Sequence, residues 1–310
     1  MGKTVLMFPG QASQYVGMAK DLYAHSDDVK ALYKMCSNEI GEDIAKLSFE
    51  GPVEKLKQTR FTQPAILLHS LAVLKILKSA LPKFDFTCGH SLGEYGALSV
   101  SGALSFEDAI KAVVKRSSLM EVSCRKNPGT MAAIIGLDEK QVEQVCKDAS
   151  KSGVVVPANF NSKNQIVISG EIEAVKNACE LAKNAGAKRA ILLEVGGAFH
   201  SPLMAPASEG LKNYLEGILL KDPLTPVIAN VTAQPVQSAL EIKKLLIEQI
   251  TAPVKWAQTM EFLSDNNVTT VIEIGPGKVL SGMAKREMSA EKIINLDTLS
   301  DIETFSAVTV

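Results

Sequence analysis

The chain has 310 residues, of which 46% are apolar, so it can form one large domain or two modest ones with a full-sized core. Its 33 Lys and Arg residues nearly balance its 34 Asp and Glu residues, and the net charge of -1 gives no general attraction to nucleic acid or to an anionic membrane. The five cysteines are scattered and show no CxxC spacing, which argues against a disulfide framework and a zinc site.

Two apolar stretches bear on the compartment. The N-terminal MGKTVLMFPG lacks the longer apolar region of a secretory signal. The most apolar stretch, residues 65–77, is too short to span a bilayer and carries Lys75. We therefore expect a cytoplasmic protein in which residues 65–77 form a buried helix.

Short apolar runs alternate with amphipathic segments, which is typical of an α/β fold with a largely parallel sheet. Ser105 followed by Asp108 is a capping signature that predicts the start of a long helix. In chain order we expect a strand over 4–8, a turn over PGQASQ, a helix from near Tyr15, the helix at 65–77, a strand over 84–88, a helix over 92–100, a helix from Ser105 past Met120, and strands over 227–231 and 269–274.

The pattern changes between residues 129 and 195. MAAIIG, VVVPANF, QIVISG and AKRAILLEV have strand character, whereas DEKQVEQVCKDAS and EIEAVKNACELAKNAG have helical character. The resulting order βαββαβ is that of a ferredoxin-like unit. We therefore predict a small domain, 128–196, inserted into a large α/β domain made of 1–127 and 197–310, with a ligand in the cleft between them.

Residues 89–93, GHSLG, match G-x-S-x-G, in which a strand turns sharply into a helix and exposes a serine hydroxyl at the sheet edge. The glycines leave room for this turn. Its place between a predicted strand and a predicted helix favours Ser91 as a nucleophile. The alternative is a glycine-flanked helix start that Ser91 caps.

A serine nucleophile needs a base within hydrogen-bond reach. His25 and His69 lie in predicted helices, where surface or core roles are expected. His90 adjoins Ser91, but neighbours in an extended segment point to opposite faces, so it is better placed to brace the turn. His200, in GGAFHSPLM, follows the last strand of the insert and is the candidate base; a loop histidine bonded to backbone is the alternative.

An acyl carbonyl under attack also needs oxyanion donors. In this turn geometry one donor is the N–H of the residue after the serine, here Leu92. The second usually comes from a loop after another strand, and Gln11 in PGQASQ fits that description. A simple turn with a helix cap explains Gln11 equally well.

Arg116 gives the clearest indication of a substrate. It lies along the flank of the apolar stripe of its helix, where a half-buried guanidinium favours a carboxylate or phosphate partner. A structural ion pair or a snorkelling stem is the alternative.

Two other signals indicate less. GPGK at 275–278 lacks the spacing of a phosphate loop and predicts a structural turn. Lys188-Arg189 and Lys285-Arg286 are small basic clusters.

Several motifs then occur in order along nearly the whole chain: FPGQASQ, TQPA at 62–65, GHSLGEY, Arg116, GAFHSPLM and IEIGPGKVLSGM. Together they resemble the malonyl-CoA:acyl carrier protein transacylase family of type II fatty acid synthesis. The resemblance implies a hydrolase-like α/β large domain with a ferredoxin-like insert, in agreement with the periodicity.

The resemblance also implies roles for individual residues. Ser91 would be the nucleophile and His200 the base, Gln11 and the Leu92 amide would hold the oxyanion, and Arg116 would hold the malonyl carboxylate. The family has a Ser-His pair whose histidine is steered by a main-chain carbonyl, near a glutamine that aligns with Gln249. Further pocket positions in the family match His90, Asn159, Asn161 and Phe199.

Phe199 resembles the malonyl-selective form of the motif, because a bulky ring leaves less room for an α-methyl group. Ala12 departs from the family, many members of which have glycine after the glutamine.

The implied reaction is ping-pong between malonyl-CoA and the phosphopantetheine thiol of holo-acyl carrier protein, with no metal and no bound cofactor. We expect a monomer, with the basic clusters as candidate docking sites for the carrier.

Other functions stay open from the sequence. A free-standing malonyl-specific acyltransferase of a polyketide synthase would use the same chemistry. A serine esterase or thioesterase would release malonate to water, and a catalytically inactive carrier-binding module would never form an acyl-serine.

Overall fold

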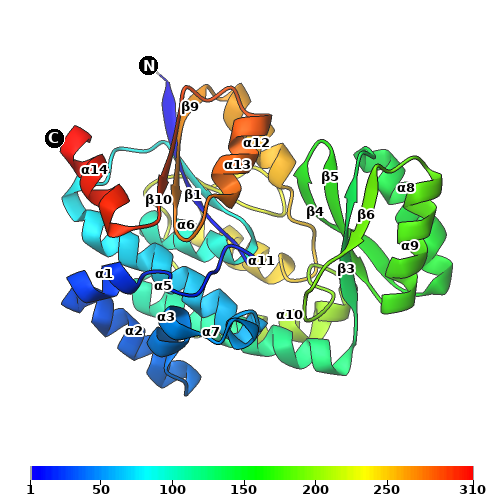
Figure 1. Cartoon of the computed structure of the whole chain (residues 1–310), viewed down its shortest axis with the longest axis horizontal. Coiled ribbons are helices and arrows are strands. Elements are labelled where there is room, and N and C mark those ends of the chain that lie inside the picture. The colour runs from blue at the N-terminus through cyan, green and yellow to red at the C-terminus, as the bar shows by residue number, and fades with distance from the viewer. Residues whose placement is uncertain (1, 310) are drawn as a thin grey trace.

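The computed structural model describes residues 2–309 and contains two β-sheets, each with its own helices (Figure 1). Within these residues the larger sheet has six strands in the order β10-β9-β1-β2-β7-β8, parallel except for the edge strand β8. The fold is therefore mixed α/β, as predicted. The strands are β1 Lys3–Phe8, β2 Phe86–Gly89, β7 Val227–Ile228, β8 Pro235–Val236, β9 Val268–Ile274 and β10 Lys292–Leu296.

Helices cover both faces of this sheet, and the central strand β1 shows why. Its alternate side chains are all buried: Leu6 and Phe8 pack into one apolar cluster, and Val5 and Met7 pack into another on the opposite face. The helices are α1 Lys20–His25, α2 Asp27–Ile40, α3 Ile44–Glu50, α4 Val53–Leu56, α5 Thr59–Leu77, α6 Glu94–Val100, α7 Phe106–Lys126, α10 Ala205–Leu215, α11 Ala239–Glu248, α12 Trp256–Asp265, α13 Val279–Glu287 and α14 Leu299–Thr309.

The second sheet is antiparallel, in the order β4-β5-β3-β6, and lies to one side of the large body with α8 and α9 packed on it (Figure 1). The chain passes through these elements as βαββαβ, which confirms the predicted order. The domain limits 128–196 stay a prediction. The elements are β3 Thr130–Ile135, α8 Glu139–Ala149, β4 Val155–Ser162, β5 Gln165–Gly170, α9 Ile172–Asn184 and β6 Arg189–Leu192.

Three predicted boundaries were wrong. The helix expected over 65–77 begins earlier, at Thr59. The helix expected from near Tyr15 begins at Lys20, because Gly17 and Ala19 have φ values of 101° and 59°, in the left-handed region that interrupts a right-handed helix. The strand expected over 227–231 ends at Ile228, since a turn closes immediately after it. By contrast, α7 begins after Ser105, whose side chain accepts a hydrogen bond from the Asp108 N–H as predicted.

The remaining structural features concern membranes, metals and thiols. No helix within residues 2–309 has the length and apolar character needed to cross a membrane. No cluster of His, Cys, Asp and Glu among the described residues has the composition to hold a metal ion. The cysteines are free thiols, and all but Cys124 are buried.

Candidate active site

The serine turn lies where β2 leaves the centre of the large sheet. Ser91 has φ 51°, so the backbone is strained at the residue that carries the candidate nucleophile. A Cβ on Gly89 would overlap the Gly93 carbonyl group, and one on Gly93 would overlap the Phe8 carbonyl oxygen. The two glycines are therefore required by close backbone contact. The Ser91 N–H donates to Asn230 Oδ1 at 2.7 Å, which fixes the turn.

Ser91 and His200 meet although they are 109 residues apart, with 2.8 Å between Ser91 Oγ and His200 Nε2. On the other side of the ring, His200 Nδ1 lies 2.8 Å from the Gln249 main-chain oxygen. A carbonyl oxygen only accepts, so Nδ1 carries the proton and Nε2 is free to accept the serine proton. The pair is thus arranged as nucleophile and base, with a carbonyl in place of an orienting acid.

The electrostatic surroundings keep this imidazole neutral. His200 is only 3% exposed, and burial, followed by the Arg116 charge, lowers its pKa to about 3. The ring can therefore accept a proton from Ser91 throughout the neutral range. Its own backbone is strained as well, with φ 56°.

Arg116 on α7 is more deeply buried than the sequence indicated, with 1% of its surface exposed. Its Nη1 donates to Gln63 Oε1 at 2.6 Å, and its Nη2 donates to Ser91 Oγ and to Gln249 Oε1, each at 3.0 Å. Within residues 2–309 no carboxylate pairs with this guanidinium, and its Nε has no partner. A buried cation without an anion beside the candidate nucleophile is suited to an anionic ligand.

A cavity of about 230 Å³ opens above these groups, between the two sheets. The large body contributes Gln11, Gln63, Met120, Phe199 and residues of α13, and the insert contributes one wall. Leu92, Arg116 and Gln249 are buried and do not line the cavity. The insert residues that line it are Met131, Ala133, Asn159, Asn161, Gln165, Val167, Leu193 and Val195.

The loop after β1 places Gln11 in the cavity lining, where its Nε2 lies 3.5 Å from Thr59 Oγ1. Ala12, the position that departs from the family, has φ 82°, a conformation in which glycine is less strained. The loop is held in this shape by a hydrogen bond from the Ala12 N–H to Gln14 Oε1 at 2.8 Å. Oxyanion roles for Gln11 and Leu92 stay predictions.

His90 and His69 are held by hydrogen bonds inside the molecule. His90 Nε2 lies 3.0 Å from Asn161 Oδ1, which links the serine turn to the insert, and burial lowers the pKa of His90. His69 is fully buried on α5 and contacts the Asp297 main-chain oxygen at 2.7 Å. His90, Asn159 and Asn161 line the cavity, and their roles toward a substrate stay predictions.

Sequence reasoning missed three residues. Glu94, at the start of α6, is 3% exposed, and its Oε2 accepts from the Asn230 N–H at 3.1 Å and from Gln249 Nε2 at 2.8 Å. Asn230 holds the serine turn, and Gln63 holds Arg116. A carboxylate inside the otherwise apolar LGEYGAL was a visible signal for Glu94, and Gln63 belongs to the TQPA motif at 62–65 without having been given a role, whereas Asn230 carried no signal.

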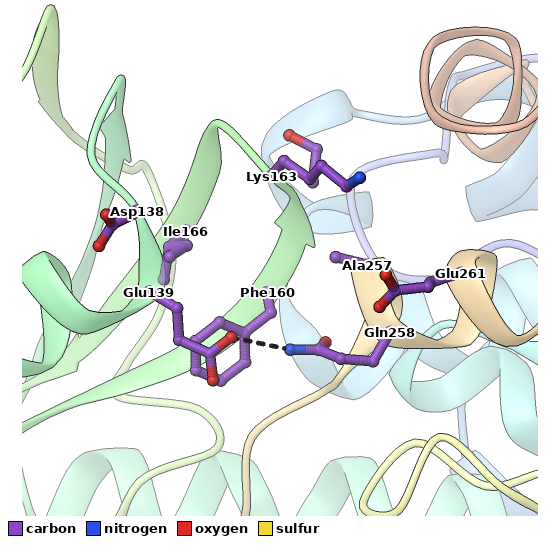
Figure 2. A pocket seen from close by; sticks show the side chains of 9 residues that line it. Asp138, Glu139, Phe160, Lys163, Ile166, Ala257, Gln258 and Glu261 are labelled. Atoms are coloured by element: carbon purple, nitrogen blue, oxygen red, sulfur yellow. Dashed lines mark hydrogen bonds between the residues drawn. The ribbon is translucent and has the colours of Figure 1, made fainter.

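A second hollow lies on the opposite face of β4 from the cavity, because strand residues alternate sides: Asn159 and Asn161 face the cavity and Phe160 faces away. Figure 2 shows Phe160 at the back of this hollow, with a hydrogen bond from Gln258 to Glu139 drawn across it. That bond, of 3.1 Å, ties α12 of the large body to α8 of the insert. No reacting group identified above lines this hollow.

Comparisons with known proteins cover nearly the whole chain. The acyl transferase domain model matches residues 5–300. Malonyl CoA-acyl carrier protein transacylase of Bacillus subtilis is 46% identical, over 98% of this chain and 95% of the relative, and that of Staphylococcus aureus MRSA252 is 41% identical, over 98% of each. The acyl-carrier-protein S-malonyltransferase structure from Bartonella henselae gives a TM-score of 0.94 at 40% identity, over 100% of this chain and 99% of that one.

A further solved structure contains a partner. It is a malonyl-transacylase in complex with the holo acyl-carrier protein of a type II polyketide synthase. It is 38% identical to this chain, with a TM-score of 0.93, and the match covers 99% of both chains.

Proposed function

Because this chain belongs to the acyl transferase domain family, we propose that it transfers a malonyl group from malonyl-CoA to the phosphopantetheine thiol of an acyl carrier protein, in fatty acid synthesis. The observation that carries the proposal is the unpaired, buried guanidinium of Arg116 at 3.0 Å from Ser91 Oγ. A carboxylate there gives the guanidinium its missing anion and brings the neighbouring thioester carbonyl to the serine.

In the first half of the reaction, Ser91 Oγ attacks the thioester carbonyl while its proton passes to His200 Nε2. The Leu92 N–H and the Gln11 side chain hold the oxyanion that forms. When the tetrahedral intermediate collapses, the carbon–sulfur bond breaks and the coenzyme A sulfur takes the proton from His200. The product is a malonyl-serine ester with His200 neutral again.

In the second half, the carrier thiol gives its proton to His200 and attacks the ester carbonyl. Ser91 leaves and recovers the proton, so that the enzyme returns to its starting state. The coenzyme A thioester is a substrate, and no metal or further cofactor takes part. The walls of the cavity limit the access of water to the ester during the exchange.

The carrier, which is usually acidic, would approach the open side of the cavity. Arg189 belongs to β6, whose continuation supplies Leu193 and Val195 to the lining, and Lys285 belongs to α13, which supplies Met283. Both basic pairs are exposed. We place carrier docking between these two pairs, because complementary charge speeds encounter. The monomeric state and the cytoplasmic location stay predictions.

The competing function supported by a specific observation is service to a polyketide synthase, since one relative of similar identity is a malonyl-transacylase solved with such a carrier. The chemistry is identical, and the carrier decides between them. Loading of the fatty acid carrier and of a polyketide carrier, compared at equal concentration, tells which one the enzyme serves.

The central experiment incubates the enzyme with radiolabelled malonyl-CoA and holo-carrier protein. We expect label on the carrier and stoichiometric release of coenzyme A. Apo-carrier, which lacks the phosphopantetheine thiol, is the matched control and stays unlabelled. Rapid appearance of free malonate with no loaded carrier would identify an esterase or thioesterase, and carrier binding without any label on Ser91 would identify an inactive binding module.

A further inference from the structure

One buried carboxylate stands behind the reacting groups without touching them. Glu94 Oε2 accepts two hydrogen bonds, from the main chain of Asn230 and from the side chain of Gln249. These two residues come from different segments, one after β7 and one at the end of α11. Asn230 in turn fixes the Ser91 N–H and the Gly89 carbonyl, the latter at 2.7 Å.

Gln249 is the point at which the site converges. Its main-chain oxygen accepts from His200, its Oε1 accepts from Arg116 Nη2, and its Nε2 donates to Glu94 and, at 3.1 Å, to the Ser91 carbonyl. The residue is 0% exposed, so water does not substitute for any of these partners. Both polar atoms of the Gln249 side-chain amide therefore have fixed hydrogen-bond partners within the protein.

The two ends of this amide fix its orientation. A guanidinium only donates hydrogen bonds and an ionised carboxylate only accepts them. If the amide were turned over, Nε2 would face the donors of Arg116 and Oε1 would face the acceptors of Glu94 and Ser91. Glu94 and Arg116 thus select one orientation and form a chain of anion, amide and cation whose hydrogen bonds are charge-assisted at both ends.

This arrangement separates the two charges by one amide. An acidic side chain in direct contact with Arg116 would occupy the guanidinium that the ligand carboxylate needs, whereas no nearby anion would leave a buried cation uncompensated. Burial raises the pKa of Glu94 to about 7, against the opposing effects of its two N–H donors and of the Arg116 charge. Where Glu94 is ionised, above about pH 7, its charge interacts with that of Arg116 across the Gln249 amide and does not occupy the guanidinium.

We infer that Glu94 is a positioning residue that holds Arg116 ready for a carboxylate-bearing acyl group, acting through the Gln249 amide. The inference rests on the proposed function and extends it, because it assigns the selection of malonyl over acetyl donors to a residue that touches neither donor.

The test compares malonyl-CoA and acetyl-CoA as donors. Second-order rates of Ser91 acylation are measured for the full-length wild type, Glu94→Gln, Arg116→Ala and the double variant. In Glu94→Gln we expect the malonyl-to-acetyl rate ratio to fall by about tenfold or more, the effect of weakening a charge-assisted hydrogen bond. In the Arg116→Ala background the same substitution should leave the ratio unchanged, because Glu94 then has no guanidinium to position.

Glu273→Gln is the matched control. Glu273 is also fully buried at a strand end of the large sheet, and it accepts hydrogen bonds from the main chain of Leu280 and Ser281. Its removal should lower thermal stability and leave the donor ratio unchanged. A merely structural role for Glu94 predicts the same outcome for both variants, and that outcome would overturn the inference.

Two further measurements keep the test decisive. If Glu94→Gln is too unstable to assay, Glu94→Asp keeps the charge and withdraws the carboxylate by one methylene, and an unchanged ratio in a folded Glu94→Asp enzyme would also reject the positioning role. Affinities for malonyl-CoA and acetyl-CoA, measured by calorimetry in a Ser91→Ala background, give the ratio without turnover. Failure of the wild type to acylate Ser91 would contradict the proposed function separately.

Discussion

The two sheets of this molecule differ in what they contribute to the site. The parallel sheet places the candidate nucleophile Ser91 after β2, the proposed oxyanion donor Gln11 after β1, and Asn230, which holds the serine turn, after β7. The antiparallel sheet supplies one wall of the cavity and no group that touches Ser91 Oγ. Parallel strands direct their ends to a common edge, which concentrates chemistry there. The large body thus holds the groups around Ser91, and the insert encloses the cavity above them.

Loss of the nucleophile is the largest effect that this division predicts. Ser91→Ala should abolish acyl-enzyme formation, because no other hydroxyl lies against His200 Nε2 in the described residues. Mass spectrometry of the enzyme after incubation with malonyl-CoA measures the adduct. Ser99→Ala removes a buried hydroxyl of α6 that bonds only the Tyr95 main chain, and it should label normally. A normal adduct in Ser91→Ala would disprove the assignment.

The anion site of the large body comes next. Arg116→Ala should reduce malonyl transfer about 10- to 100-fold, the usual value of a hydrogen bond to a charged group, and reduce acetyl transfer less. Lys115→Ala, which removes the neighbouring exposed cation from the same helix, is the control. Equal losses for the two donors would mean that the guanidinium supports Ser91 and does not bind the malonyl carboxylate.

Phe199 lies at the boundary between the two regions and lines the cavity. Phe199→Ala should raise methylmalonyl transfer relative to malonyl transfer by about tenfold, because one extra methyl group discriminates by about 1–3 kcal/mol. Parallel loading assays with both donors measure this ratio. Phe160→Ala, on the far face of β4, should destabilise the insert without changing it. An unchanged ratio in Phe199→Ala would place the selective contact elsewhere.

A residue of the insert should have a smaller effect. Asn161→Ala removes the partner of His90 Nε2, a neutral hydrogen bond worth about 1 kcal/mol, so Ser91 acylation should slow only a few-fold. Stopped-flow acylation rates test this. A loss as complete as that in Ser91→Ala would contradict the division of roles between the two sheets, since the insert would then take part in the chemistry.

Acidification should have the smallest effect on the base. The pKa of His200 is lowered to about 3, so the imidazole stays neutral and competent as pH falls from 7 to 5, where an ordinary histidine would become protonated. In Glu94→Gln, which lacks the titration of Glu94, the rate of acylation at low malonyl-CoA concentration should therefore show no fall centred near pH 6.5. In the wild type the same rate should fall as the pH drops through about 7, because protonation removes the charge of Glu94. A fall near pH 6.5 in both enzymes would contradict the neutral base.

The sequence predicted the elements better than the contacts between them. Period-two and helical patterns, with the Ser105 cap, located most strands and helices, because those signals are local. The motif around Ser91 likewise identified the turn. The full burial of Arg116 was not predicted, because α7 packs against segments that are distant in sequence.

The supporting network was also beyond sequence reasoning. Glu94 bonds to Asn230 and Gln249, which lie 136 and 155 residues away, and no local pattern encodes such a pairing. The role of Gln249 followed only from the family resemblance. The left-handed conformations of Ala12 and Ala19 depend on the loops they close and not on their own propensity.

The course of the chain into and out of the insert has an engineering consequence. Arg116 lies on α7, the helix that leads out to β3, and His200 lies on the segment that returns from β6. The proposed carboxylate-binding residue and the proposed base therefore lie on opposite sides of the insert, Arg116 before it and His200 after it. A chimaera that replaces the insert must therefore keep both Arg116 and His200 and join the new domain between them. The distance between the two junctions then determines whether Arg116 and His200 still reach the Ser91 hydroxyl.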